Sequence, residues 1–407
     1  MRRWAAQYDT ALPSYAQVRL AVGRIPPGPW IYARLTDDGG LQGPPAQDGA
    51  VVEVVDGAGR FCGHALYNST SDVRLRMLSR GKRSDLDRPR EFLRRRLASA
   101  LRLRRKVLRL DTVADAWRVV HAEGDDLPGL IVDRLGDALV CQYHSLGFWQ
   151  LRYEIDAVLR ELLPDHAVAH RFARAARGAE GFDPDDAGED GDDVPERYVH
   201  EHGVRFLVAP GASHKTGWFC DQRDNRRRVA ALAEDRDVLD LCCHAGGFAI
   251  PAALAGARHV TAVDLDEEPL GRAREAAAEN GVEIAFRHAD AFDVLREVQR
   301  ARRRPGLVVL DPHKLAKGKR DLEAAKVKYR DLNALAIGGA APGGLVATFS
   351  CSGALDLAGF AGIVFQAARR AEREVRLLEV LGAAPDHPQR PDFGRSRYLK
   401  GLLLAVD

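Results

Sequence analysis

The chain has 407 residues, and its composition of 46% hydrophobic and 29% charged residues is ordinary for a folded protein. At about 150 residues per domain, this length predicts two or three domains. The composition excludes global disorder, a collagen-like repeat and a small disulfide scaffold. The net charge is only +2, which by itself argues against a protein that binds a polyanion.

The sequence predicts neither a membrane segment nor a metal site. No apolar signal-peptide core follows the charged residues near Met1, and no run of 18 apolar residues occurs. None of the six cysteines forms a CxxC pair, so we expect no zinc site and no other metal. We therefore expect a reduced, cytoplasmic protein without a membrane partner.

Residues 1–78 are predicted to form short strands separated by turns rich in Gly, Pro and Asp. The clearest strand pair is Val51–Val55 with Phe61–Tyr67. A small β-barrel is the expected fold of this part.

Residues 79–179 are predicted to hold a basic helix and a central α/β domain. The helix covers 91–109, where apolar residues recur at helical spacing. Strands are expected within 117–148, and a second helix over 150–163.

Charge is distributed unevenly along the chain. Residues 74–109, called here the basic strip, contain fifteen Lys and Arg residues against three acids. Residues 180–196 contain nine acids and no Lys or Arg, which predicts a solvated linker. A solvated face is the simpler interpretation of the basic strip, but so one-sided a run favours contact with RNA phosphates, above all through Arg94, Arg95 and Arg96. The near-zero net charge therefore does not exclude a polyanion.

Residues 197–407 alternate strands and helices, which predicts a doubly wound parallel sheet. The expected strands are Val238–Cys243, His259–Leu265, Ile284–His288, Leu307–Leu310 and Leu345–Phe349. The expected helices are Phe248–Leu254, Glu267–Glu279, 291–303, 321–339 and 357–373.

Open α/β sheets bind ligands at the carboxyl ends of their strands. The first strand ends with Asp240 and a turn that contains Gly246, Gly247 and Phe248, without the GxGxxG pattern of a dinucleotide site. Asp264, at the next strand end, is placed to bind ribose hydroxyls or, alternatively, to favour a helix N-terminus. Asp290 is placed to accept from an adenine amino group or to cap a helix.

Two further strand ends carry Asp311 and Cys351. In the usual strand order these strands are neighbours, about 4.8 Å apart, so both side chains can face one substrate. A thiol beside a carboxylate suits covalent activation of an electron-poor ring. The alternative for Cys351 is a buried strand cysteine, but its place at the rim between Ser350 and Ser352 favours the functional interpretation.

These strand ends together resemble the class I S-adenosylmethionine (SAM)-dependent methyltransferases. More narrowly, the chain resembles the bacterial 23S ribosomal RNA 5-methylcytosine methyltransferase family, of the large-subunit methyltransferase I type. The blocks that carry the resemblance are Gly211–Asn225 (GASHKTGWFCDQRDN), Ser350-Cys351-Ser352, Asp386-His387-Pro388, Tyr398-Leu399-Lys400-Gly401, Glu123–Asp133 (EGDDLPGLIVD) and residues 51–79.

The resemblance implies a PUA barrel, a central EEHEE-type α/β domain and a Rossmann-like methyltransferase domain that uses SAM. It implies that the Cys351 thiolate adds to cytosine C6, while Asp311 holds the N3/N4 edge of the base. The cofactor residues that we expect are Asp240, Gly246, Gly247, Phe248, Asp264, Asp290, Asp311 and Gln222. The RNA-contacting residues that we expect are Lys215, Arg223, Lys314, Ser350, Ser352, Asp386 and Arg94–Arg96.

The chain departs from the family pattern at three places, one of which is the long acidic insertion over residues 180–196. His244-Ala245 replaces an aromatic residue and Thr in the Gly turn, and His313 replaces the second Pro of Asp-Pro-Pro-Lys.

The alternatives to a cytosine-C5 methyltransferase are methylation of another RNA base, such as guanine, on the same fold, or a non-catalytic RNA-binding or ribosome-assembly factor. An unrelated dehydrogenase is a poor third. Oligomeric state, monomer or homodimer, is left open.

Overall fold

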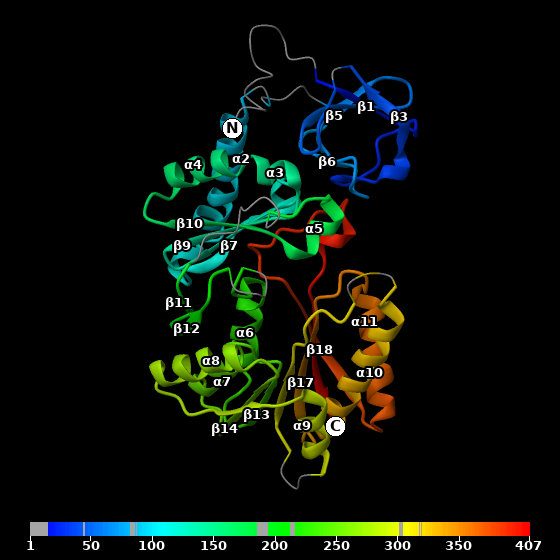
Figure 1. Cartoon of the computed structure of the whole chain (residues 1–407). Coiled ribbons are helices and arrows are strands. Elements are labelled where there is room, and N and C mark those ends of the chain that lie inside the picture. The colour runs from blue at the N-terminus through cyan, green and yellow to red at the C-terminus, as the bar shows by residue number, and fades with distance from the viewer. Residues whose placement is uncertain are drawn as a thin grey trace.

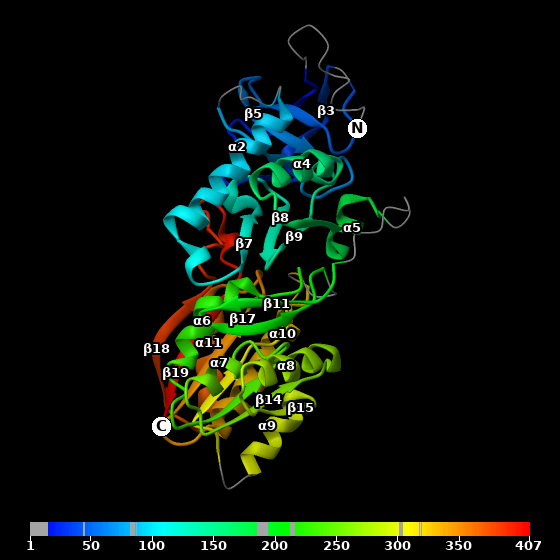
Figure 2. The same ribbon diagram turned by 90° about the vertical axis from the view of Figure 1, so that its left-hand side faces the viewer.

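A computed structural model describes residues 15–43, 45–81, 86, 88–184, 194–211, 216–300, 304–316, 318 and 320–407, with the backbone alone for 38–41. The described chain forms three parts: an N-terminal barrel, a central α/β domain and a larger C-terminal α/β domain (Figure 1). The view turned by 90° shows them stacked in that order (Figure 2).

The N-terminal part is a six-stranded sheet with the order β2-β6-β5-β4-β1-β3. Its strands are β1 (Gln17–Leu20), β2 (Trp30–Ile31), β3 (Thr36–Gln42), β4 (Val51–Val55), β5 (Phe61–Tyr67) and β6 (Leu75–Met77). The predicted pair β4 and β5 is confirmed, with Val51 opposite Leu66 in antiparallel register. Alternating apolar side chains such as Val52 and Val54 fill the interior.

The central domain is a four-stranded sheet with the order β10-β9-β8-β7. Its elements are α2 (Pro89–Arg102), β7 (Ala116–His121), β8 (Leu130–Leu135), β9 (Ala138–Tyr143), α3 (Leu146–Gln150), α4 (Arg152–Leu162), β10 (Ala167–Phe172) and α5 (Arg174–Glu180). Helix α2 buries Phe92, Leu97 and Leu101 in the core because its apolar residues recur every three or four positions. A π-helical turn, Leu103–Val107, follows it.

Glu180 differs from the expected solvated linker. It ends α5, is 2% exposed, and forms an ion pair with Arg76 of the barrel at 2.8 Å. Its other carboxylate oxygen accepts from the backbone N–H of Leu146 at 3.0 Å. The carboxylate thus joins the barrel to the central domain, which is why it is buried. Most of the predicted linker, residues 185–193, lies outside the described residues.

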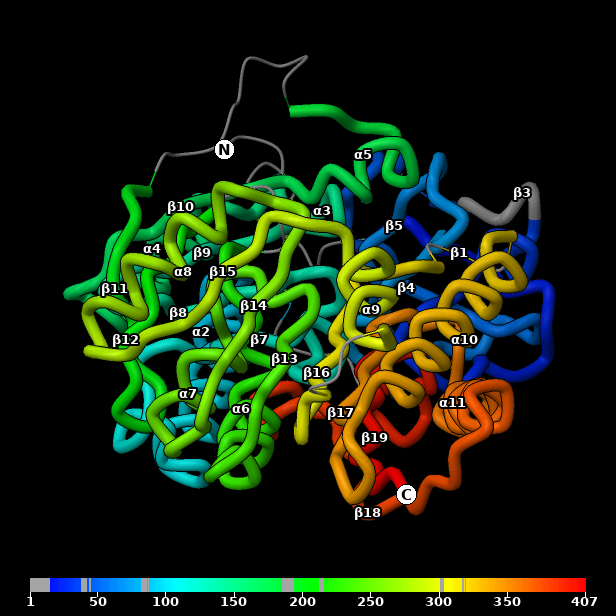
Figure 3. Tube along the Cα trace, turned by 90° about the horizontal axis from the view of Figure 1, so that it is seen from below, coloured from blue at the N-terminus to red at the C-terminus, as the bar shows by residue number. Residues whose placement is uncertain are grey.

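The C-terminal domain is a seven-stranded sheet with the order β15-β14-β13-β16-β17-β19-β18. The strands are β13 (Asp237–Leu241), β14 (His259–Asp264), β15 (Ala285–His288), β16 (Leu307–Leu310), β17 (Gly344–Ser350), β18 (Val375–Gly382) and β19 (Lys400–Val406). The helices are α6 (Arg223–Ala230), α7 (Ala249–Leu254), α8 (Glu267–Glu279), α9 (Ala291–Arg300), α10 (Leu322–Gly339) and α11 (Leu357–Arg370). Seen from below, α6, α7 and α8 lie on one side of the strands and α9, α10 and α11 on the other (Figure 3). A hairpin of β11 (Arg197–Glu201) and β12 (Val204–Val208) precedes this domain.

The five strands predicted for this domain are confirmed within three residues at each end, and β13 to β17 run parallel. Strands β18 and β19 were not among the strands predicted from the sequence. Strand β19 is antiparallel to both of its neighbours, β17 and β18. The sheet is therefore mixed rather than wholly parallel. Strand β18 alternates poorly, with Leu377, Leu378 and Val380 exposed, so it lacks the two-residue period that signals a strand.

Residues 383–399 connect β18 to β19 by a long excursion, which runs back to the central domain beside α5 (Figure 1). Its Phe393 ring lies 4.9 Å from the Trp30 ring of the barrel, centroid to centroid. The backbone carbonyl of Asp386 accepts from Arg104 of the central domain at 2.6 Å. This single excursion therefore contacts all three parts of the chain.

None of the helices that the structure describes has the length and apolar character that a membrane crossing needs. Within the same residues, no group of three or more His, Cys, Asp or Glu is arranged to hold a metal ion.

Candidate active site

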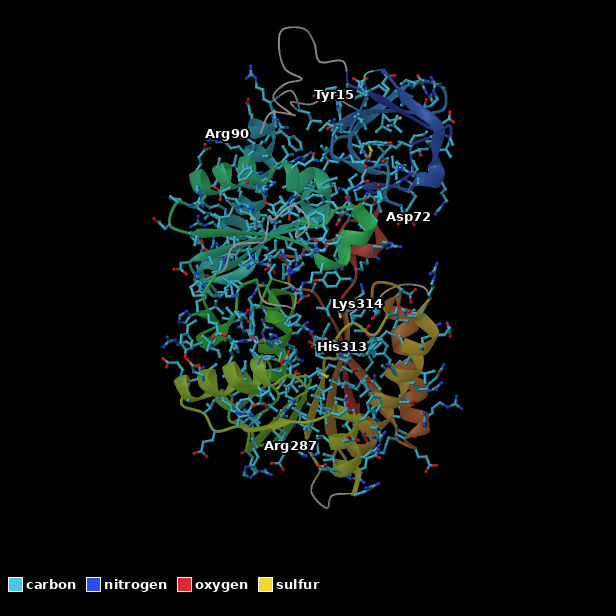
Figure 4. All side chains as sticks on the ribbon, in the orientation of Figure 1. Tyr15, Asp72, Arg90, Arg287, His313 and Lys314 are labelled. Carbon is cyan, nitrogen blue, oxygen red and sulfur yellow. The ribbon has the colours of Figure 1, made fainter. Side chains whose placement is uncertain are left out.

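A cavity of about 850 Å³ opens at the carboxyl ends of β13, β14, β16 and β17, where parallel sheets place their ligands. Its lining includes Asp264, Asp290, Asp311 and Cys351, four of the residues predicted from the strand ends. His313 and Lys314, also in the lining, lie where the C-terminal domain faces the central domain (Figure 4). The topology thus brings residues from separate strand ends to one site.

One end of the cavity is formed by the turn after β13. Cys242, His244 and Gly246 adopt positive φ angles of 61°, 49° and 76°, a region that costs energy for residues with a side chain. A Cβ at Gly246 would lie 3.0 Å from the Ile250 side chain, so a larger residue would need a small shift of Ile250 as well as a strained φ. Cys242, Cys243, His244 and Gly247 of this turn line the cavity.

Two carboxylates beside this turn are held by backbone amides. Asp264 accepts from the N–H of His244 at 2.8 Å and from that of Asp266 at 3.0 Å. Asp290 accepts from the N–H of Phe292 at 2.7 Å. Each carboxylate therefore orders a turn and also lines the cavity, so its structural role does not exclude the ligand role predicted from the sequence.

Asp240 lies beneath the same turn and is fully buried. Burial, and then the negative charge of Asp311, raise the pKa of Asp240 to about 8. Asp240 does not line the cavity, so its carboxyl group supports the turn from the interior of the sheet.

His244 stands where the family has an aromatic residue. It lines the cavity, and its imidazole is also a planar ring. Its ring packs edge-on against Phe219, with centroids 5.0 Å apart. Its neighbour Ala245 is buried. This departure therefore preserves an aromatic wall beside the Gly turn.

The lining fits SAM by its charge and its apolar surface. Its acidic members are Asp221, Asp264, Asp266, Asp290 and Asp311, and its Lys and Arg members are Arg226, Lys314 and Lys328. An excess of carboxylates suits a ligand with a positive sulfonium and a positive ammonium group. Apolar surface from Leu265, Ala291 and Phe292 lies beside Asp264 and Asp290, as a nucleoside requires.

The other end of the cavity carries Asp311 and Cys351. Each directly follows one of the adjacent parallel strands β16 and β17, which pair Leu310 with Thr348. Asp311 accepts from the side-chain amide of Gln222 at 2.8 Å. Asn225 in turn donates to the Gln222 carbonyl oxygen at 2.6 Å. Gln222, predicted to bind the cofactor, thus orients the Asp311 carboxylate.

Ser350 and Ser352 differ from their predicted role in substrate binding. Both are fully buried, and each lies at hydrogen-bond distance from the Tyr329 hydroxyl, at 2.9 and 3.0 Å. Ser352 also accepts from the N–H of Ala316 at 3.1 Å. The serines therefore hold the backbone on both sides of Cys351, while Cys351 itself is half-buried and lines the cavity.

Arg223 and Asp386 also differ from their predicted role in RNA contact. They are 1% and 0% exposed and pair with each other through two hydrogen bonds of 3.0 and 3.1 Å. Neither lines the cavity. Their contact joins α6 to the excursion, so it is a structural bond between parts of the fold.

The other predicted residues divide into two groups. Lys314 is exposed and lines the cavity, and Gly247 and Phe248 line it on the cofactor side. Lys215 lies outside the described residues.

Tyr398 has no role predicted from the sequence, although it belongs to the Tyr398-Leu399-Lys400-Gly401 block that resembles the family. Tyr398 comes from the excursion, lines the cavity and donates to Asp221 at 2.6 Å.

The basic strip is partly neutralised by ion pairs. Arg94 lies 3.9 Å from Glu161, and Arg96 pairs with Asp126 at 2.9 Å. Arg95 is exposed beside the Phe92 ring, with its guanidinium carbon 5.9 Å from the ring centroid. Arg104 is fully buried and pairs with Asp125. Further along the strip, Arg102, Lys106 and Arg109 are exposed, and none of them forms an ion pair with a described residue.

Comparisons with known proteins agree with this geometry. Residues 130–404 match the family described as S-adenosylmethionine-dependent methyltransferase, and residues 28–80 match the PUA-like domain. Ribosomal RNA large subunit methyltransferase I of Aeromonas salmonicida is 36% identical over 382 residues, which covers 93% of this chain and 95% of that protein. The protein of the same name from Tolumonas auensis is 35% identical over 383 residues, with the same coverage.

Two solved structures share the fold of nearly the whole chain. A protein of Streptococcus mutans assigned as a SAM-dependent methyltransferase has a TM-score of 0.78 at 18% identity, covering 96% of this chain and 100% of that chain. SMU.776, assigned as a methyltransferase and solved in complex with SAH, has a TM-score of 0.78 at 19% identity, covering 96% and 99%. The expected PUA-like barrel, the Rossmann-like domain and SAM as the cofactor are confirmed. The chain belongs to the ribosomal RNA large subunit methyltransferase I family of SAM-dependent methyltransferases.

Proposed function

We propose that this chain methylates C5 of a cytosine in 23S ribosomal RNA through a covalent adduct between Cys351 and cytosine C6. The observation that carries the proposal is the placement of Cys351 and Asp311 in the same cavity as Asp264 and Asp290. The names of the relatives support large-subunit ribosomal RNA as the substrate. A ribosomal substrate also favours the cytoplasm as the compartment.

The reaction begins at Cys351. The thiolate adds to C6 of the cytosine and forms an S–C6 bond, which makes C5 nucleophilic. C5 then takes the methyl group that SAM supplies, S-adenosylhomocysteine is left as the S–CH3 bond breaks, and a general base removes the C5 proton. The electron pair of the broken C–H bond restores the C5–C6 double bond as the S–C6 bond breaks, which regenerates the thiolate.

Asp311 is assigned to the N3/N4 edge of the cytosine. A carboxyl group there accepts from the N4 amino group and holds a proton at N3, which gains negative charge as the thiolate adds to C6. The Gln222 amide limits the rotation of this carboxylate, so the base is met by an acceptor that is already oriented.

The cofactor residues are assigned to the opposite end of the cavity. Asp264 binds the ribose hydroxyls and Asp290 the adenine amino group, as their positions after β14 and β15 favour. The turn at Gly247, which lines the cavity, holds the amino-acid part of the cofactor. Lys314, exposed at the rim, contacts an RNA phosphate.

The experiment is transfer of a labelled methyl group to ribosomal RNA from a strain that lacks this gene, followed by nucleoside mass spectrometry. We expect 5-methylcytidine as the product with the native enzyme and none with Cys351→Ala. Cys62→Ala is the matched control, because Cys62 is a half-buried thiol in the distant barrel, and it should retain full activity.

Each other outcome has a definite meaning. A methylated guanosine would assign the chain to another base, and full activity of Cys351→Ala would exclude the covalent mechanism. Absence of SAM binding in calorimetry would favour the non-catalytic RNA-binding or ribosome-assembly factor.

A further inference from the structure

Lys400 is a buried cation directly behind Cys351. It opens β19 and pairs in register with Ser350, the last residue of β17. Its side chain is almost wholly enclosed, with 4% of the residue exposed. Its Nζ donates to the backbone carbonyls of Ser352 and Tyr398, both at 2.7 Å. The ammonium group therefore lies against the short turn that carries Cys351.

This ammonium has no carboxylate within ion-pair distance among the residues that the structure describes; its two hydrogen-bond partners are neutral carbonyls. A buried charge without an opposite charge is costly, so its retention calls for an anion. The ionisable groups around this turn are Cys351 itself, Asp356 at the start of α11, Lys314 after β16 and Tyr329 on α10. Among them, Cys351 is the group that must become an anion in the proposed reaction.

We propose that Lys400 is a positioning residue for the nucleophile, and that its ammonium stabilises the thiolate of Cys351. The inference rests on the proposed role of Cys351. The ammonium keeps its own protons throughout, and the thiol proton leaves to solvent before the sulfur attacks C6. Lys400 touches neither base nor cofactor and acts only through the sulfur.

The charge on Lys400 persists at neutral pH. Burial lowers the pKa of Lys400 to about 8, and the interaction with Cys351 opposes that shift. The side chain is therefore mostly protonated below about pH 8. Because a nearby cation favours the charged form of a thiol, it lowers the thiol's pKa. Removing the charge on Lys400 should therefore raise the pKa of the Cys351 thiol.

The test measures ionisation of the Cys351 thiol without any methyl transfer. The full-length protein is alkylated with iodoacetamide at a series of pH values, and mass spectrometry follows the rate at the Cys351 peptide. With Lys400→Met, and with Lys400→Gln, which can still donate to a carbonyl, we expect the midpoint to rise by about one pH unit or more. With Lys400→Arg, which keeps the charge, we expect the midpoint of the native protein.

Cys62 supplies an internal control, because its alkylation in the same samples should not respond to any change at Lys400. Thermal melting identifies variants that have lost the fold, and Lys400→Gln keeps the test valid if Lys400→Met is one of them. Equal Cys351 midpoints in the native protein and in a folded neutral variant would overturn the inference. A shifted midpoint in a protein that makes no 5-methylcytidine would instead refute the proposed function and leave the inference standing.

Discussion

The carboxylate of Asp386 accepts two hydrogen bonds from the guanidinium of Arg223, at 3.0 and 3.1 Å, and both side chains are buried. A third donor, the backbone N–H of Arg118, reaches the same carboxylate at 2.8 Å. Arg223 begins α6, Arg118 lies in β7 of the central domain and Asp386 lies in the excursion. One carboxylate therefore joins three segments that are far apart in the sequence, directly beside the residues that form the cavity.

Asp386→Ala should destabilise the protein more than it alters chemistry. The change leaves the Arg223 guanidinium buried without its carboxylate, and breaking such a pair costs about 3–5 kcal/mol. The free energy of unfolding, from denaturant titration, measures the effect. Asp224→Ala is the matched control, because Asp224 also contacts Arg223 but is 48% exposed, and its loss should change little. Equal stability of the two variants would contradict a structural role for the pair.

The same carboxylate predicts a dependence of stability on pH. Burial by itself would raise the pKa of Asp386, but His387 and Arg223 hold the pKa well below its ordinary value. A pKa lower in the folded than in the unfolded state stabilises the fold above the unfolded value of about 3.9. That contribution decreases as the pH falls below about 4. Unfolding experiments at pH 7 and pH 3 should therefore show a smaller difference between native protein and Asp386→Ala at pH 3, whereas a constant difference would exclude this linkage.

Gln222→Leu should slow methyl transfer and leave SAM affinity nearly unchanged. The substitution removes the amide that donates to Asp311, and a hydrogen bond to a charged group contributes about 1.5–3 kcal/mol. We expect a fall of about 10- to 100-fold in the single-turnover rate, with calorimetry as the measure of cofactor binding. A large loss of SAM affinity at an unchanged rate would return Gln222 to the cofactor-binding role predicted from the sequence.

Asp290→Ala should weaken SAM binding. It removes a carboxylate from the cofactor end of the cavity, and we expect the dissociation constant from calorimetry to rise about tenfold, the effect of one lost hydrogen bond to a charged group. Asp293→Ala is the control, since Asp293 lies in the next turn of the chain and pairs with Arg296 on the surface. If both variants bind SAM like the native protein, Asp290 serves only as a helix cap.

The basic strip should contact RNA chiefly through its C-terminal part. Arg102, Lys106 and Arg109 are exposed, whereas Arg94 and Arg96 already have acidic neighbours. Charge reversal of Arg102, Lys106 and Arg109 to Glu should therefore lower RNA affinity more than charge reversal of Arg94–Arg96. It should also reduce the slope of log affinity against log salt by about 0.7–0.9 for each phosphate that the protein no longer neutralises. Filter binding over a salt series measures the affinity and its salt dependence. If neither triple change alters RNA affinity, the RNA binds elsewhere on the protein.

Much of the site followed from the sequence because parallel strands bring their carboxyl ends to one edge. Asp264, Asp290, Asp311 and Cys351 each follow a recognisable apolar strand, and the cavity joins all four. Roles could be expected for these residues because a local pattern marked the end of each strand.

Residues whose contacts lie far away in the chain could not be assigned in this way. Arg223 and Asp386 stand in blocks shared with the family, but the sequence does not show that they are buried against each other. Lys400 pairs with Ser350 only because the last strands turn antiparallel, a feature that the poorly alternating β18 concealed. The sequence by itself determined the fold class and the cofactor, and it marked Cys351 as the candidate nucleophile, because these depend on local strand–turn patterns. Only the tertiary structure decided which charged residues face the cavity and which hold the fold together, because burial is set by contacts between distant segments.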